Sequence, residues 1–340
     1  MIPRTVIRRG LRLLALALVV VVALVGLLAA AFRVQFTGDP AGWAKSTDND
    51  ALWLGHMWVD GRRTRADVAE LAERLRGTGI RDLYVHSGPF EADGRLDPAK
   101  YPAARNFVKW VHAALPGVRV SAWLGQKVDG VLDLDDARSR ANVLDGVRAV
   151  VAAGFDGVHY NFEPIGSGDE EFLDLLARTR PLTRLLSTST PQIEPYPLMR
   201  PAARLALSHD KYWSQDYFRR VAERVDQVAV MTYDTGMPMR PLYGGYVARQ
   251  AELALDLVPE DRLLLVGAPA YHDHGVSWSD DAESVADAAR AARLALSEHG
   301  SEHGRRERFG LAMYVDFAAT EQDWREYASE WLIDGAHPGR

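Results

Sequence analysis

A run of alternating polar and apolar residues near the middle of the chain ends on a glutamate. Residues 156–163 read DGVHYNFE, so His159, Asn161 and Glu163 fall on one face of a predicted β-strand. Three polar side chains in a row on a buried face are costly unless they have partners or a function. Because a partly buried glutamate keeps its proton to a higher pH, Glu163 is our candidate for a general acid. The alternative is a buried Glu163 that pairs with an arginine and stabilises the fold.

A second polar group is predicted at the end of another strand. In residues 228–234, VAVMTYD, the alternation puts Met231 and Tyr233 on one face and Asp234 at the start of the following loop. A phenol and a carboxylate at a strand end can hold a polar substrate group by hydrogen bonds. Asp234, or Asp316 after a later strand, is also a candidate for a second carboxylate that acts with Glu163.

Aromatic residues fall near the ends of several predicted strands. Trp58, Trp123 and Tyr271 have such positions, and Trp278 lies in the loop that follows Tyr271. Sugar rings present apolar C–H faces that stack on aromatic rings, so these residues are candidates for contacts with a glycan. Packing in the core is the alternative for each of them, because aromatic side chains dominate protein cores.

Short apolar or β-branched runs alternate with amphipathic stretches over most of the chain. Strands are predicted at residues 51–58, 80–86, 118–124, 156–163, 184–189, 227–234, 262–270 and 309–316. Helices are predicted near residues 65–76, 103–115, 136–153, 169–180, 215–224, 246–257, 281–299 and 321–331. Eight strand–helix units predict a (β/α)8 barrel, in which the active site lies at the carboxyl ends of the strands. A doubly wound open sheet is the alternative, but no glycine-rich phosphate loop follows the first predicted strand.

Two other features are interpreted as loops. Residues 191–214 contain four prolines and are predicted to form a packed loop without a helix. Gly244 and Gly245 are predicted to be loop glycines, because they have neither the phosphate-loop nor the dinucleotide-binding spacing.

The first 33 residues differ in composition from the rest of the chain. They hold five of the 40 basic side chains and none of the 46 acidic ones, so the remaining 307 residues carry a net charge of about −11. Residues 13–32 are an unbroken apolar run, long enough as a helix to cross the ~30 Å hydrocarbon core of a bilayer. Most arginines precede this run, so the positive-inside rule predicts a cytoplasmic N-terminus and an extracytoplasmic C-terminal domain. The alternative is a signal peptide that is cleaved near residues 29–31, which would leave a secreted domain.

These observations predict four segments and exclude several classes of function. We expect a cytoplasmic basic stub and transmembrane signal anchor at residues 1–33, a linker at 34–50, a barrel at 51–334 and a tail at 335–340. The acidic domain is a poor binder of nucleic acid, because phosphate contacts need clustered lysine and arginine. The chain has no cysteine, which excludes disulfides, thiolate metal sites and a thiol nucleophile.

The two strand-end segments resemble motifs of glycoside hydrolase family 18, the chitinase-like barrels. Residues 155–163, FDGVHYNFE, are similar to the fourth-strand pattern Asp-Gly-x-Asp-x-Asp-x-Glu, and residues 225–234, VDQVAVMTYD, are similar to the sixth-strand Met-x-Tyr-Asp segment. Residues 265–271 and 310–314 resemble the seventh and eighth strands, with Tyr314 where the family usually has tryptophan. The order and spacing of the four segments fit the family over residues 51–331, and the chain would be a divergent member.

The resemblance implies substrate-assisted hydrolysis of a glycan that carries N-acetylamino sugars, as in chitin or peptidoglycan. In this mechanism the glutamate protonates the glycosidic oxygen, and the 2-acetamido carbonyl of the substrate attacks the anomeric carbon. An aspartate two residues before the glutamate orients the acetamido group and balances the charge of the oxazolinium intermediate. Mapped onto this chain, Glu163 is the acid, and Tyr233 and Asp234 hold the substrate. His159 and Asn161 replace the two later aspartates; Asn161 can still orient an amide, but its lack of charge should slow the reaction.

Three functions follow from these residues. The favoured one is an extracytoplasmic glycoside hydrolase without a cofactor, held in the membrane through residues 13–32. Its predicted catalytic residues are Glu163, Asn161, Tyr233 and Asp234, and its predicted carbohydrate contacts are His159, Trp58, Trp123, Tyr271, Tyr314 and Asp316. The second is a chitinase-like protein that binds glycans without cleaving them, which the retained Glu163 disfavours. The third is a metal-dependent hydrolase or deacetylase, with ligands among His56, His86, His159 and the His272-Asp273-His274 segment.

Overall fold

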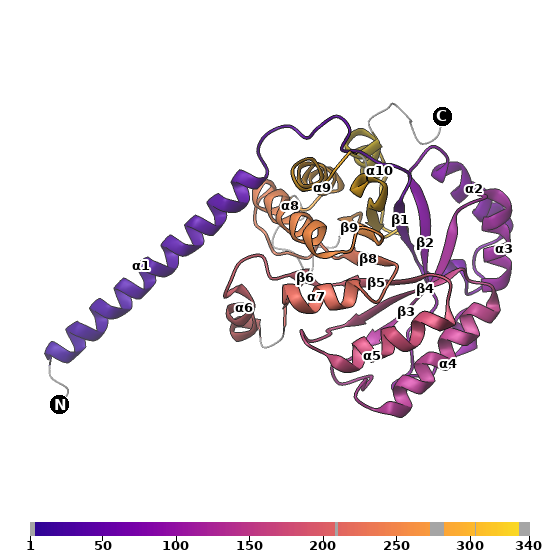
Figure 1. The fold of residues 1–340 in the computed structure, drawn as a ribbon, viewed down its shortest axis with the longest axis horizontal. Coiled ribbons are helices and arrows are strands. Elements are labelled where there is room, and N and C mark those ends of the chain that lie inside the picture. Colours follow the sequence, from indigo (N-terminus) through magenta and orange to yellow (C-terminus); the bar gives the residue numbers. More distant parts are fainter. Residues whose placement is uncertain (1–3, 208–209, 273–281, 303, 333–340) are drawn as a thin grey trace.

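Eight parallel strands close into a barrel at the centre of the molecule (Figure 1). The computed structural model describes residues 4–207, 210–272, 282–302 and 304–332. Around the barrel the strands follow the order β1-β10-β9-β8-β5-β4-β3-β2. Their bounds are β1 Asp50–Leu54, β2 Ile80–His86, β3 Arg119–Lys127, β4 Gly157–Glu163, β5 Leu186–Thr190, β8 Gln227–Val230, β9 Leu263–Pro269 and β10 Phe309–Tyr314. The predicted (β/α)8 barrel is confirmed.

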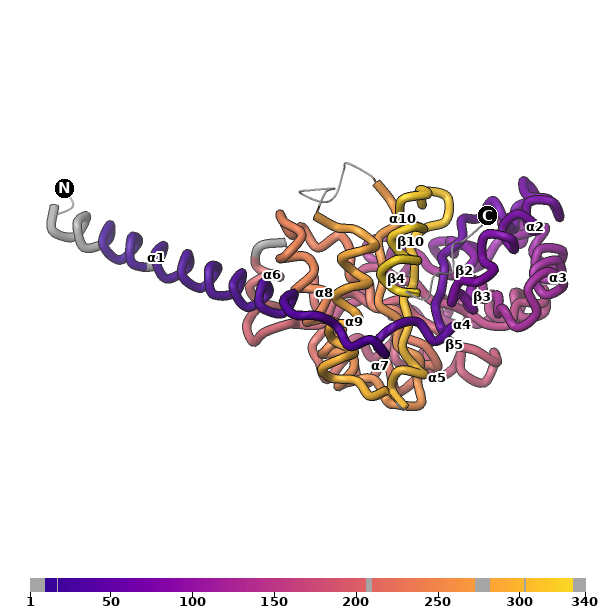
Figure 2. The backbone as a smooth tube through the Cα atoms, turned by 90° about the horizontal axis from the view of Figure 1, so that it is seen from above, coloured from indigo at the N-terminus to yellow at the C-terminus, as the bar shows by residue number. Residues whose placement is uncertain are grey.

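Helices cover the outside of the barrel and return the chain from each strand to the next (Figures 1 and 2). They are α2 Arg65–Leu75, α3 Ala104–Ala114, α4 Ala137–Ala153, α5 Glu170–Thr179, α7 Gln215–Ala222, α8 Arg240–Leu257, α9 Val285–His299 and α10 Glu321–Tyr327. Most begin at a side chain that accepts a hydrogen bond from a backbone N–H of the first turn, as Thr64, Asp136, Asp169, Ser214, Ser284 and Thr320 do. Their apolar faces pack on the outward-facing residues of the strands and form the main core.

Two predicted strands end four residues earlier than expected. The first strand stops at Leu54, and Trp58 lies in a following 3-10 turn at His56–Trp58. The strand predicted at 227–234 stops at Val230, so Tyr233 and Asp234 lie in the loop after it. In both places the sequence keeps alternating after hydrogen bonding to the neighbouring strands has ended, and alternation alone does not mark that end.

Two predicted loops contain helices instead. The insert after β5 holds a short helix, α6 Met199–Leu207, and a pair of two-residue strands, β6 Gln192–Ile193 and β7 Tyr212–Trp213. Pro201 lies in the first turn of α6, where a missing N–H breaks no helical hydrogen bond. Gly244 and Gly245 belong to the first turns of α8, which begins earlier than predicted, at Arg240.

The N-terminal helix α1, Arg4–Gln35, packs on the barrel by its last turns and projects away from it (Figures 1 and 2). Its stretch Gly10–Gln35 has the length and apolar composition of a membrane-spanning helix, a property that signal sequences share. The connector to β1 lies along α9, where Ala41 N–H donates to Ser297 Oγ at 2.8 Å and Arg293 donates to the Ala44 carbonyl at 2.6 Å. The predicted tail, residues 335–340, lies outside the described residues.

Candidate active site

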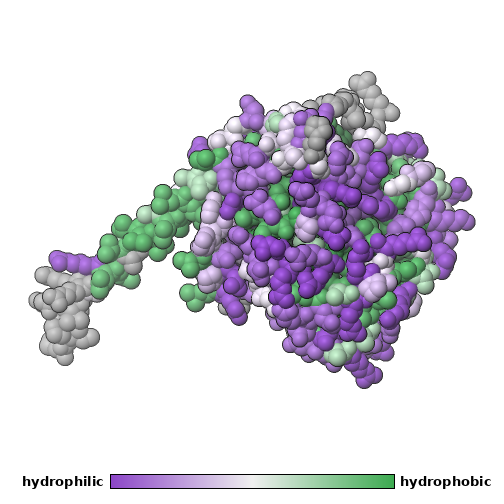
Figure 3. Space-filling model, in the orientation of Figure 1, coloured by the Kyte–Doolittle hydropathy of each residue, from purple (hydrophilic) through white to green (hydrophobic). Residues whose placement is uncertain are grey.

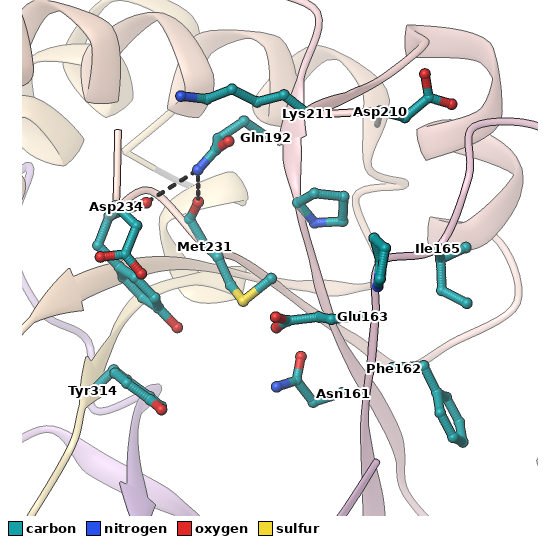
Figure 4. A pocket seen from close by; sticks show the side chains of 13 residues that line it. Asn161, Phe162, Glu163, Ile165, Gln192, Asp210, Lys211, Met231, Asp234 and Tyr314 are labelled. Atoms are coloured by element: carbon teal, nitrogen blue, oxygen red, sulfur yellow. Dashed lines mark hydrogen bonds between the residues drawn. The ribbon is translucent and has the colours of Figure 1, made fainter. Parts of the chain in front are cut away.

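A cavity of about 510 Å³ opens at the carboxyl ends of β4, β5, β8 and β10 (Figure 4). Its size suits a small ligand or a few sugar units. The residues that line it come from four strand ends and from the insert after β5. They are Asn161, Phe162, Glu163, Pro164, Ile165, Pro191, Gln192, Asp210, Lys211, Met231, Tyr233, Asp234 and Tyr314. The four residues predicted to be catalytic are therefore brought together in one cavity.

Glu163 is the last residue of β4, and its carboxylate points into the cavity (Figure 4). Desolvation by the surrounding cavity walls raises the pKa of this carboxyl, and the nearby negative charge of Asp234 raises it further. A hydrogen bond from Asn161 and the positive charge of Lys127, its register partner on β3, act in the opposite direction. The net effect is a raised pKa, which favours the protonated form that a general acid needs.

The amide of Asn161 has a fixed orientation. Ser189 on β5 donates its hydroxyl proton to Asn161 Oδ1 at 2.5 Å. Because the oxygen of the amide accepts from Ser189, the NH2 group is the part of Asn161 that can donate to Glu163, and a hydrogen bond from Asn161 lowers the pKa of that carboxyl. The amide can therefore position an acid, or the amide of a substrate, without contributing any charge.

Tyr233 and Tyr314 line one wall of the cavity, and Tyr271 packs against both of them. Tyr233 and Tyr314 stack with ring centroids 5.1 Å apart, and Tyr271 meets both rings edge-on. The ring of Tyr233 fits because β9 has a glycine beside it: a Cβ on Gly267 would lie 2.9 Å from Tyr233 Cε1. Gln192 holds the loop after β8 by donating to the carbonyls of Met231 and Tyr233 (Figure 4). Tyr271 and Tyr314 are half-buried and Tyr233 is buried, so the apolar surface open to a sugar face comes mainly from Tyr271 and Tyr314.

A network of polar contacts fixes the position of Asp234. Its backbone has a φ of 54°, which is uncommon for a residue other than glycine. The carboxylate of Glu283 accepts hydrogen bonds from the N–H groups of Asp234 and Thr235, at 2.9 and 2.8 Å, and stabilises this turn. The hydroxyl of Tyr271 donates to Asp234 Oδ1 at 2.5 Å. Lys211 donates to the Thr235 carbonyl at 2.9 Å, so one ammonium group lies near two carboxylates.

His159 does not reach the cavity, contrary to its predicted role as a substrate contact. Its side chain is fully buried in the barrel interior, where it stacks on Tyr84 at 3.8 Å. Trp53 Nε1 donates to His159 Nε2 at 3.1 Å, so the proton of a neutral ring lies on Nδ1, 2.8 Å from Ser187 Oγ. Desolvation lowers the pKa of His159 to about 3. The imidazole is therefore neutral and is part of the core.

A chain of hydrogen bonds continues from His159 to the opposite end of the barrel. Each donor in it points the same way, from Trp53 through His159, Ser187, Tyr84 and Gln227 to Asp82. Arg119 completes it with a paired hydrogen bond to the Asp82 carboxylate, at 2.6 and 2.9 Å. These polar residues of the interior are thus partnered with one another, and the charges among them, on Asp82 and Arg119, are at the far end.

Trp58 and Asp316 lie together beside a different cavity, of about 530 Å³, between α2 and α10. Asp316 accepts from Trp58 Nε1 at 2.6 Å and from Gly55 N–H at 2.8 Å, so both carboxylate oxygens are used to hold the turn after β1. The structure therefore does not place Asp316 as the second carboxylate beside Glu163. Trp123 meets the ring of Tyr314 edge-on at 6.0 Å and packs behind the tyrosine wall.

Among the residues that the sequence analysis missed are four that hold Asn161, Asp234 or the loop after β8, namely Ser189, Gln192, Lys211 and Glu283. Ser189 ends a predicted strand and Gln192 follows it in the predicted loop, and a polar residue at or just after a strand end is a signal that could have been followed. Lys211 and Glu283 lie in loops, and no local pattern indicates that they approach Asp234.

The histidines proposed as metal ligands do not come together in the part of the chain that the structure describes. His56 and His86 have rings 5.4 Å apart, but both nitrogens of His159 have protein partners. His272 contacts Asp323 at 2.9 Å, and Asp273, His274 and Trp278 lie outside the described residues. Among the described residues, one group with ligand-like geometry, Glu252, Glu298 and His299, lies on α8 and α9, away from the cavity.

The structure is similar to solved structures of glycan-degrading enzymes. It superimposes on the spore cortex-lytic enzyme SleL of Bacillus cereus with a TM-score of 0.58 and 13% identity, over 84% of this chain and 75% of that one. A chitinase of Chromobacterium violaceum gives a TM-score of 0.56 with 13% identity, over 84% and 98% of the two chains. The GH18 chitinase ChiB of Flavobacterium johnsoniae gives 0.51 with 12% identity, over 84% and 95%.

No protein-family model and no curated protein matches the sequence. At identities this low, the structural similarity establishes the fold and leaves activity to be argued from the site. The resemblance noted in the strand motifs is confirmed at the level of the fold: the chain has the barrel fold of the glycoside hydrolase family 18 chitinases, at 12–13% sequence identity to the structures named.

Proposed function

We propose that the protein is an extracytoplasmic glycoside hydrolase that cleaves a glycan containing N-acetylamino sugars. The observation that carries this proposal is the pairing of Glu163, a carboxyl with a raised pKa, with the oriented amide of Asn161 inside one cavity. The cluster of Tyr233, Tyr271 and Tyr314 supports it, because stacked aromatic rings suit the apolar faces of sugars.

The geometry supports a substrate-assisted mechanism. Glu163 gives its proton to the glycosidic oxygen as the bond from that oxygen to the anomeric carbon breaks. The acetamido oxygen of the same sugar forms a bond to the anomeric carbon, which yields an oxazolinium intermediate and a free leaving group. Asn161 forms a hydrogen bond with the acetamido group and holds its oxygen in line with the anomeric carbon. Glu163, now ionised, then takes a proton from the water that opens the intermediate.

Asp234 provides the negative charge in this proposal. A cation develops at the oxazolinium stage, and a fixed anion close to it lowers the barrier. His159 is neutral and Asn161 carries no charge, so strand β4 does not supply that anion. Asp234 lines the cavity, is held by Tyr271, and lies close enough to Glu163 to raise its pKa.

We also propose that α1 anchors the barrel in a membrane, with the basic N-terminus in the cytoplasm. The exposed apolar surface of residues 11–27 supports this, because such a surface is stable in lipid and costly in water. In the alternative, α1 is a signal sequence and the domain is released. Both arrangements place the cavity outside the cytoplasmic membrane.

A second candidate function is glycan binding without cleavage. The observation that favours it is the loss of both later aspartates of the strand motif, since His159 and Asn161 together bring no negative charge to the cavity side of β4. The cavity and its tyrosines would serve a binding protein equally well.

One experiment separates the two functions. The full chain in lipid nanodiscs is incubated with acetylated glucosamine oligomers, peptidoglycan fragments and neutral β-glucans, beside the variant Glu163→Gln, which keeps the shape of the side chain. Cleavage of acetylated substrates that is lost in the variant supports the hydrolase. Equal binding by both proteins without cleavage supports the binding protein. Cleavage that survives in Glu163→Gln would refute the role of Glu163.

A further inference from the structure

The two glycines at the start of α8 make room for helix α1. A Cβ on Gly245 would lie 1.7 Å from the carbonyl oxygen of Phe32, and a Cβ on Gly244 would lie 2.4 Å from the ring of Phe36. The backbones of the two helices therefore approach more closely than any residue with a side chain would allow. The two glycines therefore form the surface of α8 on which the last turns of α1 pack.

Side chains around this contact also fix the last turns of α1. Phe32 is buried, meets Tyr246 edge-on at 5.4 Å and packs on Tyr196 at 5.7 Å. Gln35 donates to Glu252 on α8 at 3.1 Å. The end of α1 is thus packed as a part of the barrel wall, so the barrel has a fixed orientation relative to the exposed part of α1.

The contacts of α1 show on which side it leaves the barrel. Gln35 reaches Glu252 in the middle of α8, Phe32 meets Gly245 near its start, and Leu28 packs in a cluster with Met199 of α6. In a (β/α)8 barrel the helices start at the carboxyl ends of the strands, which is where the cavity opens. Helix α6 also follows a strand end, since it belongs to the insert after β5. Upstream of Leu28 the helix is exposed and extends away from this end of the barrel (Figures 1 and 2).

An exposed apolar surface flanks the point where α1 leaves. Leu198 and Leu205, at and next to α6, are 77% and 89% exposed, and Met239 at the start of α8 is 54% exposed. Figure 3 shows the apolar surface of α1 continuing onto the adjacent edge of the barrel. Arg204 on α6 and Arg33 on α1 are also exposed here, and cationic side chains beside apolar ones suit the headgroup region of a bilayer.

We propose that this rim, formed by Leu198, Leu205 and Met239 around α1, rests on the outer surface of the bilayer that α1 spans. The cavity then opens toward the membrane, and its substrate is a glycan displayed at the membrane surface, such as one attached to lipid. The inference about the substrate rests on the proposed glycosidase function and on α1 as an uncleaved anchor. The same insert carries the exposed leucines and the cavity residues Asp210 and Lys211, so contact of the rim with lipid places the cavity wall at the headgroups.

Fluorescence quenching in proteoliposomes tests the placement. The chain has no cysteine, so a single introduced cysteine can carry one environment-sensitive label. The variants of the full chain are Leu205→Cys on the rim, Asp261→Cys in the exposed turn before β9 at the opposite end of the barrel, and Leu18→Cys within α1. The quenchers are nitroxide lipids, labelled at the headgroup in one preparation and in the acyl chain in another.

We expect headgroup nitroxides to quench the label at position 205 and leave the label at 261 bright, while acyl-chain nitroxides quench the label at 18. Quenching at 18 with none at 205 would overturn the inference and leave the anchor intact. No quenching at 18 would overturn both, because α1 would then not span the bilayer.

A second measurement tests the substrate. The variant Leu198→Gln/Leu205→Gln is compared with the wild type on an acetylated glucosamine oligomer, free in solution or attached to a lipid in the same vesicles. We expect the double variant to lose cleavage of the lipid-attached oligomer and to keep cleavage of the free oligomer. Equal cleavage of both forms by both proteins would refute the preference for a membrane-displayed glycan without touching the glycosidase proposal. Lack of any cleavage by the wild type would refute the glycosidase and, with it, the substrate inference, while the quenching result stands by itself.

Discussion

Restoring an aspartate at position 161 is the sharpest perturbation of the proposed chemistry. In Asn161→Asp the shape of the side chain is kept, and Ser189 can still donate to the oxygen it now contacts. The change replaces the NH2 group, whose hydrogen bonding lowers the pKa of Glu163, with a second carboxylate oxygen. Two carboxylates in hydrogen-bonding contact cannot both ionise easily, so the last proton of the pair should be held to a higher pH.

The size of this shift follows from the separation of the charges. Groups that hydrogen-bond place their charge centres about 4 Å apart, where two unit charges interact by about 1 kcal/mol in water and about 4 kcal/mol at an effective dielectric constant of 20. Glu163 lines an open cavity, so its environment lies between these limits. At 1.36 kcal/mol per pKa unit, the upper pKa of the pair should rise by about one to three units.

The assay is the pH dependence of kcat/KM, whose alkaline limb reports the pKa of the acid in the free enzyme. We expect this limb to move to higher pH in Asn161→Asp. Asp234→Asn is the matched control of opposite sign, because it removes a charge that raises the pKa of Glu163, and its limb should move to lower pH. An alkaline limb that stays in place in Asn161→Asp, or moves down, would refute the contact between positions 161 and 163.

Three other predictions concern the parts that support the cavity. His159 has a depressed pKa in the folded chain and an ordinary one when unfolded, so stability should be lost as the pH falls from about 6.5 toward 3. The free energy of unfolding in urea should therefore be about 2 kcal/mol lower at pH 5 than at pH 7 from this residue alone. The variant His159→Gln should reduce that difference. Glu283→Gln should lose at least one of the hydrogen bonds that hold the turn at Asp234, which is expected to raise KM for an oligosaccharide while the thermal midpoint changes little. Gly245→Ala should displace α1 and expose its last turn to protease, whereas Gly26→Ala, whose Cβ would have no neighbour within 4 Å, should not.

The fold was predictable because its signals are local. The strand at residues 80–86 was predicted with the bounds that β2 has, since its apolar residues and its flanking turn are contiguous in the sequence. The barrel was predicted from the regular alternation of eight strands and helices along the sequence. The insert after β5 was misjudged, because four prolines indicate a loop unless one of them falls in the first turn of a helix, as Pro201 does.

The site was only partly predictable because its contacts join distant strands. The alternation along β4 put His159, Asn161 and Glu163 on one face, and that face is the interior of the barrel. Depth along the barrel axis is set by the neighbouring strands, so alternation could not show that His159 lies in the packed interior while Glu163 lies at the mouth. The bond from Ser189 to Asn161 likewise depends on the register between β4 and β5.

The position of the negative charge leads to a last prediction. In the motif that the chain resembles, the anions next to the acid are on the strand itself, whereas here Asp234 is an exposed loop residue. Salt screens exposed charges, with a Debye length of about 10 Å at 0.1 M and about 3 Å at 1 M, and screens buried charges much less. If Asp234 stabilises the developing cation, kcat at saturating neutral substrate should fall as the salt concentration rises, since substrate binding no longer limits the rate. The same titration on Asp234→Asn should start from a lower kcat and be nearly flat. A fall of equal steepness in both proteins would mean that the stabilising charge lies elsewhere in the cavity.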